Sequence, residues 1–229
     1  MSLGCFAAHR KQPQSIPGKE ILNLQMDDEE FTDSGPNSMS VLKIGTVSLN
    51  TSVQRIGTGC AFLNPGYLTI AAPATRTFVL DGPFLIDGWV RGPGDYNRNT
   101  VLSVGHYTDG LLFRAFDNST SDVWVCNRGV NLPTVELFPK DIWTYFAFTR
   151  DANWTVSFYI AVNGGNVERK IQFYNLKDVI NSQNNNVMIG AAYHFNGGHQ
   201  WNGYIDAFRM SSGFPYDLKS APFKIENTI

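Results

Sequence analysis

Apolar and polar positions alternate along most of this chain, in short segments separated by turn residues. In residues 84–90, Phe84 and Ile86 fall on one side of an extended chain, and Leu85 and Asp87 fall on the other. A period of two is the signature of a β-strand with two different faces. The repetition of such segments predicts an all-β protein.

The strongest pair of segments predicts a hairpin. Residues 143–150 and 154–162 are both rich in aromatic and β-branched residues, and a short loop at 151–153 separates them. Further strands are predicted at residues 21–26, 41–47, 58–63, 67–70, 100–105, 111–116, 122–126, 186–192 and 201–210. Asn64, Pro65 and Gly66 predict a turn, and only residues 175–181 favour a short helix.

No linker rich in Pro, Ser or Gly divides residues 21–229, so these residues are expected to form one domain, a two-sheet antiparallel sandwich or a barrel. Residues 1–20 are predicted to be an extended arm, because Pro13 and Pro17 prevent regular pairing. The arm carries apolar and basic candidate contacts. These are Leu3, Phe6, Arg10 and Lys11. Such an arm packs either on its own domain or on a neighbouring molecule, and its basic residues either meet an acidic surface or stay solvated.

Composition narrows the functional classes. Charged residues make up 17% of the chain and its net charge is −2, so a basic surplus for binding nucleic acid is missing. No run of about 18 apolar residues occurs, so neither a membrane span nor a secretory signal is expected. The cysteines Cys5, Cys60 and Cys126 are too sparse for a disulfide framework and lack metal-ligand spacing, which indicates folding in a reducing compartment.

Four groups of residues, in this order, resemble one family. They are residues 22–35, residues 67–70 with 84–90, residues 143–164, and residues 188–190 with 203–211. Together they resemble the concanavalin A-like, laminin-G-like jelly-roll domains over about residues 20–225. The resemblance implies two antiparallel sheets, one of them concave, with the first and last strands close together. Family resemblance does not by itself give function.

Catalysis has little support in the residues. A glycosidase needs two carboxyl groups about 5–9 Å apart, one on each side of the scissile bond. Asp87 is alone in its strand and Asp206 is alone in its own, and the histidines have no nucleophile signature beside them. We therefore predict no catalytic residues. A polysaccharide hydrolase using Asp87 is a distant alternative.

A calcium ion is the one cofactor that the sequence suggests. Asp27 and Asp33 lie in an acidic loop, and Asp206 comes from the last strand, which the resemblance places beside the first. Carboxylate oxygens are suitable calcium ligands. The alternative is a solvated acidic loop that binds no metal.

One loop combines aromatic and amide side chains in the way that binding surfaces do. The predicted partner-binding or glycan-binding residues are Tyr193, His194, Phe195, Asn196, His199 and Trp201, with Tyr96 from another loop. The alternative is that these aromatic residues fix long loops to the edge of the sandwich.

The format of one sandwich with an arm resembles laminin-G-like domains of tailed-bacteriophage particles. It predicts a non-enzymatic virion structural protein made in the host cytoplasm, most simply a capsid decoration (cement) protein. Such a protein binds the major capsid protein, or another virion protein, as a symmetric homo-oligomer. The alternative is a glycan-binding lectin or adhesin, such as a tail-associated receptor-binding module.

Overall fold

The computed structural model describes residues 18–71, 79–97, 99–115, 119–178, 180–181, 186–192 and 199–213. Its elements run in the order β1 (Lys19–Leu24), β2 (Ser40–Asn50), β3 (Cys60–Ala71), β4 (Val79–Leu80), β5 (Phe84–Arg91), β6 (Asn99–Val104), β7 (Leu111–Ala115), β8 (Thr120–Val125), β9 (Arg128–Pro133), α1 (Thr134–Leu137), β10 (Thr144–Arg150), β11 (Val156–Val162), β12 (Glu168–Phe173), β13 (Ile180–Asn181), β14 (Asn186–Ile189) and β15 (Gly203–Ser212). All the strand pairs are antiparallel, which confirms the predicted all-β sandwich.

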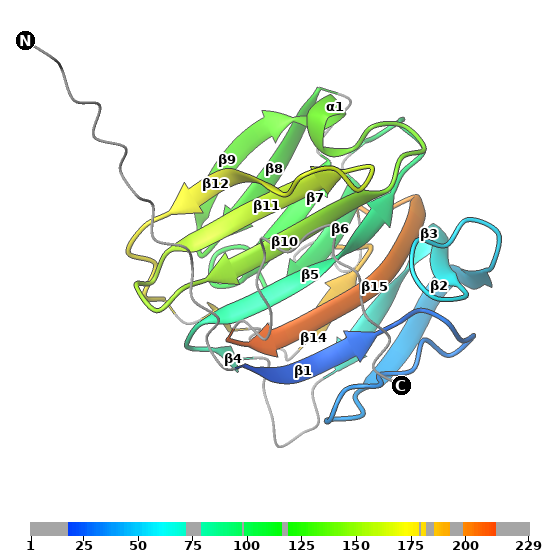
Figure 1. Cartoon of the computed structure of the whole chain (residues 1–229), viewed down its shortest axis with the longest axis horizontal. Helices are drawn as coiled ribbons and strands as arrows, with labels where there is room; N and C mark the ends of the chain where they lie inside the picture. The colour runs from blue at the N-terminus through cyan, green and yellow to red at the C-terminus, as the bar shows by residue number, and fades with distance from the viewer. Residues whose placement is uncertain are drawn as a thin grey trace, which may run out of the picture.

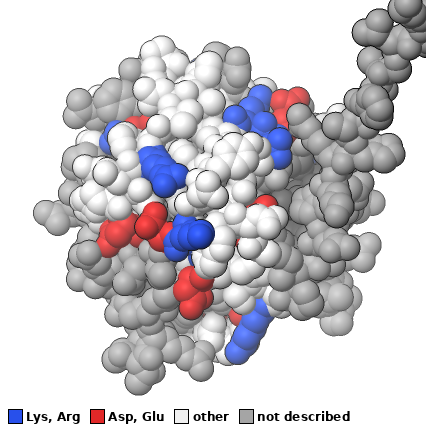
Figure 2. Space-filling model, turned by 90° about the vertical axis from the view of Figure 1, so that its left-hand side faces the viewer, with Lys and Arg blue, Asp and Glu red and all other residues white. Residues whose placement is uncertain are grey.

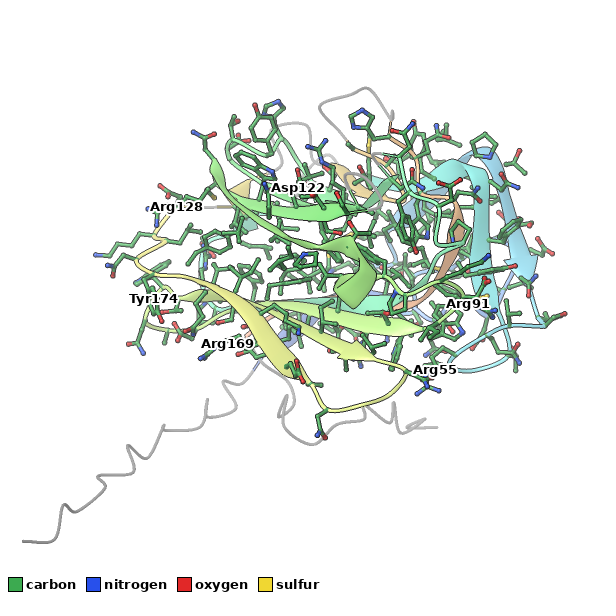
Figure 3. The ribbon with its side chains drawn as sticks, turned by 90° about the horizontal axis from the view of Figure 1, so that it is seen from above. Arg55, Arg91, Asp122, Arg128, Arg169 and Tyr174 are labelled. Carbon is green, nitrogen blue, oxygen red and sulfur yellow. The ribbon has the colours of Figure 1, made fainter. Side chains whose placement is uncertain are left out.

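The strands form two facing layers (Figures 1 and 3). The front layer has the order β12-β11-β10-β5-β15, with β1 beyond β15; the back layer has the order β3-β14-β6-β7-β8-β9, with β2 beyond β3. The layers are continuous at one corner, where Gly203 to Ile205 of β15 pair with Ala61 to Leu63 of β3. β1 pairs with β15, as the resemblance implied for the first and last strands.

The core lies between the layers and consists of the inward half of each alternating strand. Phe113 of β7 is at its centre, with ring centroids 5.5 Å from Phe146, 5.9 Å from Phe148 and 4.8 Å from Phe158. These rings come from both layers, so their burial fixes the layers against each other. The predicted hairpin of β10 and β11 therefore supplies the front-layer rings that pack on Phe113.

A buried arginine beside this core binds two separate chain segments, one at β4 and the turn after it and one just before β13. Arg150 at the end of β10 is fully buried and donates hydrogen bonds to the carbonyl oxygens of Gly82 (2.8 Å), Asp178 (2.8 Å) and Leu80. Its guanidinium lies 5.2 Å from the ring centroid of Phe84. Burial lowers the pKa of Arg150, and the three carbonyl oxygens compensate in part for its lost hydration.

Three local predictions need correction. Asn64 to Gly66 do not form a turn: β3 runs through them, and the β2–β3 ladder absorbs the irregularity as a bulge near Gly45. Residues 175–181 contain the short strand β13 in place of a helix, and the only described helix is α1. Pairing across the sheet overrides the local turn signal of Pro and Gly. β1 begins at Lys19, so the predicted arm is shortened at its end.

Cys60 and Cys126 are buried free thiols. Burial raises the pKa of Cys60 to about 12 and that of Cys126 to about 11. A thiol with such a pKa is almost entirely protonated at neutral pH, so neither is a nucleophile in the folded protein.

At the end of the sandwich where β9 begins and β12 ends, Arg128 donates a hydrogen bond of 2.9 Å to the carbonyl oxygen of Tyr174 and so links the two layers (Figure 3). The side of the molecule shown in Figure 2 carries basic and acidic side chains next to one another among its described residues. This face therefore lacks the one-signed charge that a polyanion would need.

Candidate functional site

A row of side chains crosses the outer face of the back layer. The residues opposite one another in β2, β3, β14, β6, β7, β8 and β9 are Leu42, Thr69, Met188, Ser103, Leu112, Trp124 and Gly129. Val123 and Val125, on either side of Trp124 in the sequence, belong to the core. Because strand side chains alternate, Trp124 and Asp122 lie on the opposite, outer face.

Trp124 is held flat on this face. A Cβ atom added to Gly129 would lie 2.6 Å from the nearest indole atom, so the ring passes directly over the Gly129 backbone. The Tyr107 ring packs against the indole at a centroid distance of 5.4 Å and an interplanar angle of 71°. The indole N–H donates a hydrogen bond of 3.1 Å to Asp122 Oδ2. The half-buried ring thus has a fixed orientation, with one side on Gly129.

Next to the ring is a well-formed ion pair. Arg114 Nε donates to Asp122 Oδ1 at 2.7 Å, and Arg114 Nη2 donates to Asp122 Oδ2 at 2.7 Å. Both side chains are largely buried. A bidentate arginine–carboxylate pair is directional and strong, although desolvation offsets much of its net free energy. Its main effect here is positional, because the Asp122 carboxylate also orients Trp124.

The described end of the predicted binding loop, His199 and Gln200, lies next to this ion pair. The carbonyl oxygen of His199 accepts a hydrogen bond of 2.7 Å from the Thr100 N–H, and Gln200 forms a bridge with Thr100. His199 Nδ1 lies 3.4 Å from Arg114 Nη1. We call Tyr107, Arg114, Asp122, Trp124 and His199 the Trp124 site. Asp122 is seen over the upper layer in Figure 3.

The predicted loop residues divide into three groups. Tyr193, His194, Phe195 and Asn196 lie outside the described residues. His199 belongs to the Trp124 site. Trp201 and Tyr96 need correction, because both are buried and stack on each other at a centroid distance of 5.5 Å. Phe138 packs 5.3 Å from Trp201, so these buried rings present no face to a ligand. The arm contacts Leu3, Phe6, Arg10 and Lys11 also lie outside the described residues.

The three carboxylates predicted to bind calcium do not form one cluster. Asp33 is buried and accepts backbone N–H groups from Asn23, Gly35 and Met39, so it stabilises its own loop. Asp27 Oδ1 accepts the N–H of Gly59 at 2.9 Å. Within the described ranges, no group of three or more His, Cys, Asp or Glu side chains is arranged to hold a metal ion. The predicted calcium set therefore does not fit this arrangement.

Asp206 instead fixes the loop between β2 and β3. Its Oδ2 accepts the N–H groups of Arg55 (2.7 Å) and Ile56 (2.9 Å). Burial raises the pKa of this carboxyl to about 7; the charge of Asp27 adds to the shift and the two N–H groups oppose it. Asp206 Oδ1 is buried without a hydrogen-bond partner among the described residues.

Asp87, on which the alternative of a polysaccharide hydrolase depends, already binds two neighbouring side chains. Its Oδ2 accepts the Tyr145 hydroxyl at 2.7 Å, and Arg209 forms an ion pair with it at 2.6 Å. The carboxyl is fully buried. A carboxylate enclosed and neutralised in this way is poorly placed to donate a proton to a substrate or to attack one.

Sequence reasoning missed the central residues of the Trp124 site. The signal was present in residues 111–125, where Arg114 interrupts the apolar strand Leu111–Ala115 and Asp122 comes directly before Val123, Trp124 and Val125. Charged residues within such strands are expected to pair. What the sequence does not give is the register that places Arg114 opposite Asp122 and Trp124 opposite Gly129.

Among the residues that the structure describes, no helix is long and apolar enough to cross a membrane. No curated protein matches the chain as a relative. The family model described as the concanavalin A-like lectin/glucanases superfamily matches residues 65–214.

Solved structures share the fold. The chain is similar to the botulinum neurotoxin type G receptor binding domain (TM-score 0.59, 20% identity, 88% of this chain and 49% of that one). It is also similar to the binding domain of serotype D (TM-score 0.64, 14% identity, 88% and 50%). A third is a structure of neurotoxin type C, whose cell entry depends on interaction with two ganglioside molecules (TM-score 0.57, 14% identity, 87% and 48%). The chain spans about half the length of these proteins, and at such identities the likeness concerns the fold.

Proposed function

The chain belongs to the concanavalin A-like lectin/glucanases superfamily, and from this premise we propose that it is a non-catalytic glycan-binding protein whose Trp124 site holds a neutral saccharide. The observation that carries the proposal is the flat indole of Trp124 beside the Arg114–Asp122 pair. An aromatic ring of fixed orientation offers an apolar surface to the C–H face of a sugar, and neighbouring polar groups bind its hydroxyls.

The chemistry of the site favours an uncharged ligand. Arg114 and Asp122 neutralise each other, so an added carboxylate or amine would find no unpaired charge in this pair. Sugar hydroxyls both donate and accept hydrogen bonds, which suits the guanidinium, the carboxylate and the His199 imidazole together. Preorganisation by these mutual contacts reduces the entropy lost on binding.

The comparisons support a binding role rather than capsid decoration. The similar solved structures are binding domains of toxins. One of these toxins, the type C neurotoxin, depends on interaction with two ganglioside molecules for cell entry. Nothing in them points to a virion, a capsid partner or a phage. The virion location and the homo-oligomer remain predictions of the sequence. Co-sedimentation with virus particles and the molar mass in solution would test them.

The test begins with an array of neutral oligosaccharides, followed by titration calorimetry of the best ligand. Trp124→Ala should weaken binding by about tenfold or more, since a buried tryptophan contact is typically worth about 1.4 kcal/mol or above. Gly129→Ala keeps the indole but forces it off the strand, and should also weaken binding. Tyr174→Ala removes an exposed aromatic residue at another edge and serves as the matched control.

Unchanged affinity in both Trp124→Ala and Gly129→Ala, with unfolding midpoints like those of the original protein, would contradict the proposed site. Failure of every neutral saccharide to bind would contradict the proposed function. A loss of binding in Tyr174→Ala equal to that in Trp124→Ala would mean that the effect is not specific to the site.

A further inference from the structure

The outer face of the front layer carries a second surface, independent of the Trp124 site. Its residues, Arg55, Phe62, Arg91, Trp143 and Tyr204, form what we call the arginine–aromatic surface. In Figure 3, Arg55 and Arg91 lie at the right-hand end of the lower layer, away from Asp122 on the upper one. Arg91, Trp143 and Tyr204 of this surface belong to the front layer, and Phe62 joins them from β3 at the corner where the two layers are continuous.

The aromatic rings of this surface touch one another. Tyr204 lies 4.9 Å from Phe62 and 6.4 Å from Trp143 between ring centroids. Trp143 is fixed by a hydrogen bond of 2.9 Å from its indole N–H to the Val53 carbonyl oxygen. All three rings are half-buried, so they form an ordered shelf with accessible edges and faces.

Arg55, in the loop between β2 and β3, carries a charge that no described carboxylate pairs. Its guanidinium lies 4.6 Å from the ring centroid of Trp89 and forms no hydrogen bond or ion pair with the described residues. The Arg55 N–H is fixed by Asp206, and a Cβ added to Gly164 would lie 2.7 Å from Arg55 Nη2. The side chain is thus an exposed cation whose position is fixed by its loop, its aromatic support and a neighbouring glycine.

Arg91 lies opposite Tyr204 in the β5–β15 ladder and is only weakly paired. Its guanidinium lies 5.7 Å from the Tyr204 ring centroid, and the nearest carboxylate oxygen, on the exposed Asp141, is 3.9 Å away. Arg91 Nε is buried and donates no hydrogen bond among the described residues. An exposed pair at this distance contributes little, so Arg91 keeps donors for another anion.

We propose that the arginine–aromatic surface binds an acidic saccharide, with carboxylate or sulfate groups on Arg55 and Arg91 and a sugar ring against Trp143 or Tyr204. Two arginines beside a group of aromatic rings match a ligand that carries both anionic groups and ring faces. The protein as a whole has a net charge of −2, so a bulk attraction for anions does not account for such binding. The recognition is local and depends on these side chains.

The probe is a heparin hexasaccharide, measured by titration calorimetry against chitohexaose, a neutral chain of equal length. Arg55→Gln should lower the affinity for the acidic probe about tenfold, and Arg55→Lys should restore it only in part, because an ammonium group lacks the planar guanidinium. Arg91→Gln should have a similar effect. Each loss should shrink as salt is raised from low to high concentration, since charge pairs are screened.

Arg169→Gln is the matched control, because Arg169 is exposed on β12 and forms no hydrogen bond or ion pair with the described residues. It should leave the affinity for the acidic probe unchanged. Equal binding by the original protein and Arg55→Gln would overturn the proposal. So would tighter binding of a glutamate hexapeptide, which would assign the surface to acidic protein segments. Neither outcome bears on the proposed Trp124 site, which is tested separately by the binding of neutral saccharides.

Discussion

Replacing Asp206 with asparagine should change how the stability of the protein depends on pH. The folded-state pKa of Asp206 is about 7, compared with its ordinary value of 3.8. Between these values the folded protein holds a proton on this carboxyl that the unfolded chain has released. Stability therefore falls as pH rises through this window, at about 1.4 kcal/mol per pH unit. Over about three units the loss is on the order of 4 kcal/mol.

The side-chain amide in Asp206→Asn would keep an oxygen for the N–H groups of Arg55 and Ile56 while removing the titration. Urea unfolding of both proteins should be measured from pH 4 to pH 8, and the difference in their free energies of unfolding plotted against pH. We expect the stability of the asparagine variant relative to the original protein to rise between pH 4 and about pH 7 and to level off above that pH. Asp27→Asn should reduce the gain, because the charge of Asp27 contributes to the raised pKa. Two parallel pH profiles would refute the reasoning.

Two further substitutions test the account of the fold by urea unfolding. Arg150→Met leaves the carbonyl oxygens of Leu80, Gly82 and Asp178 without their buried donor and should cost about 3 kcal/mol or more, whereas Arg169→Met should change stability by less than about 0.5 kcal/mol. Equal effects would contradict the structural role of Arg150. Gly45→Ala should cost about 1–3 kcal/mol, because φ is +74° and a Cβ would lie 2.7 Å from the Pro65 carbonyl oxygen; Gly82→Ala, with open space around it, is the control. A neutral Gly45→Ala variant would mean that the bulge tolerates a side chain.

The parts of the fold that the sequence predicts well are those where one face of a strand is buried. β10 and β11 are flagged by their aromatic alternation, and both lie where the pattern predicts them. The turn predicted at Asn64 to Gly66 fails for the opposite reason. Its local signal is strong, but pairing of β2 with β3 on both sides of Pro65 stabilises the extended chain.

The candidate site shows a similar limit. Trp201 follows a polar, glycine-rich stretch, so the sequence suggested an exposed aromatic residue; its burial depends on Tyr96 and Phe138, which are far away in the chain. The sequence pattern predicts Trp124 only as a strand residue. Its role depends on Gly129 beneath the ring and on Asp122 two positions earlier, and only the strand register brings these groups together. Composition and periodicity do not contain that register.

The most direct test of the glycan-binding proposal is fluorine NMR of the protein labelled with 5-fluorotryptophan. The chain has five tryptophans, and single substitution to phenylalanine assigns each resonance. The account predicts that a neutral saccharide shifts the resonance of Trp124 in a saturable way and leaves those of Trp89 and Trp143 in place. A saccharide that binds without moving the Trp124 resonance, or that shifts only Trp89 and Trp143, would contradict it.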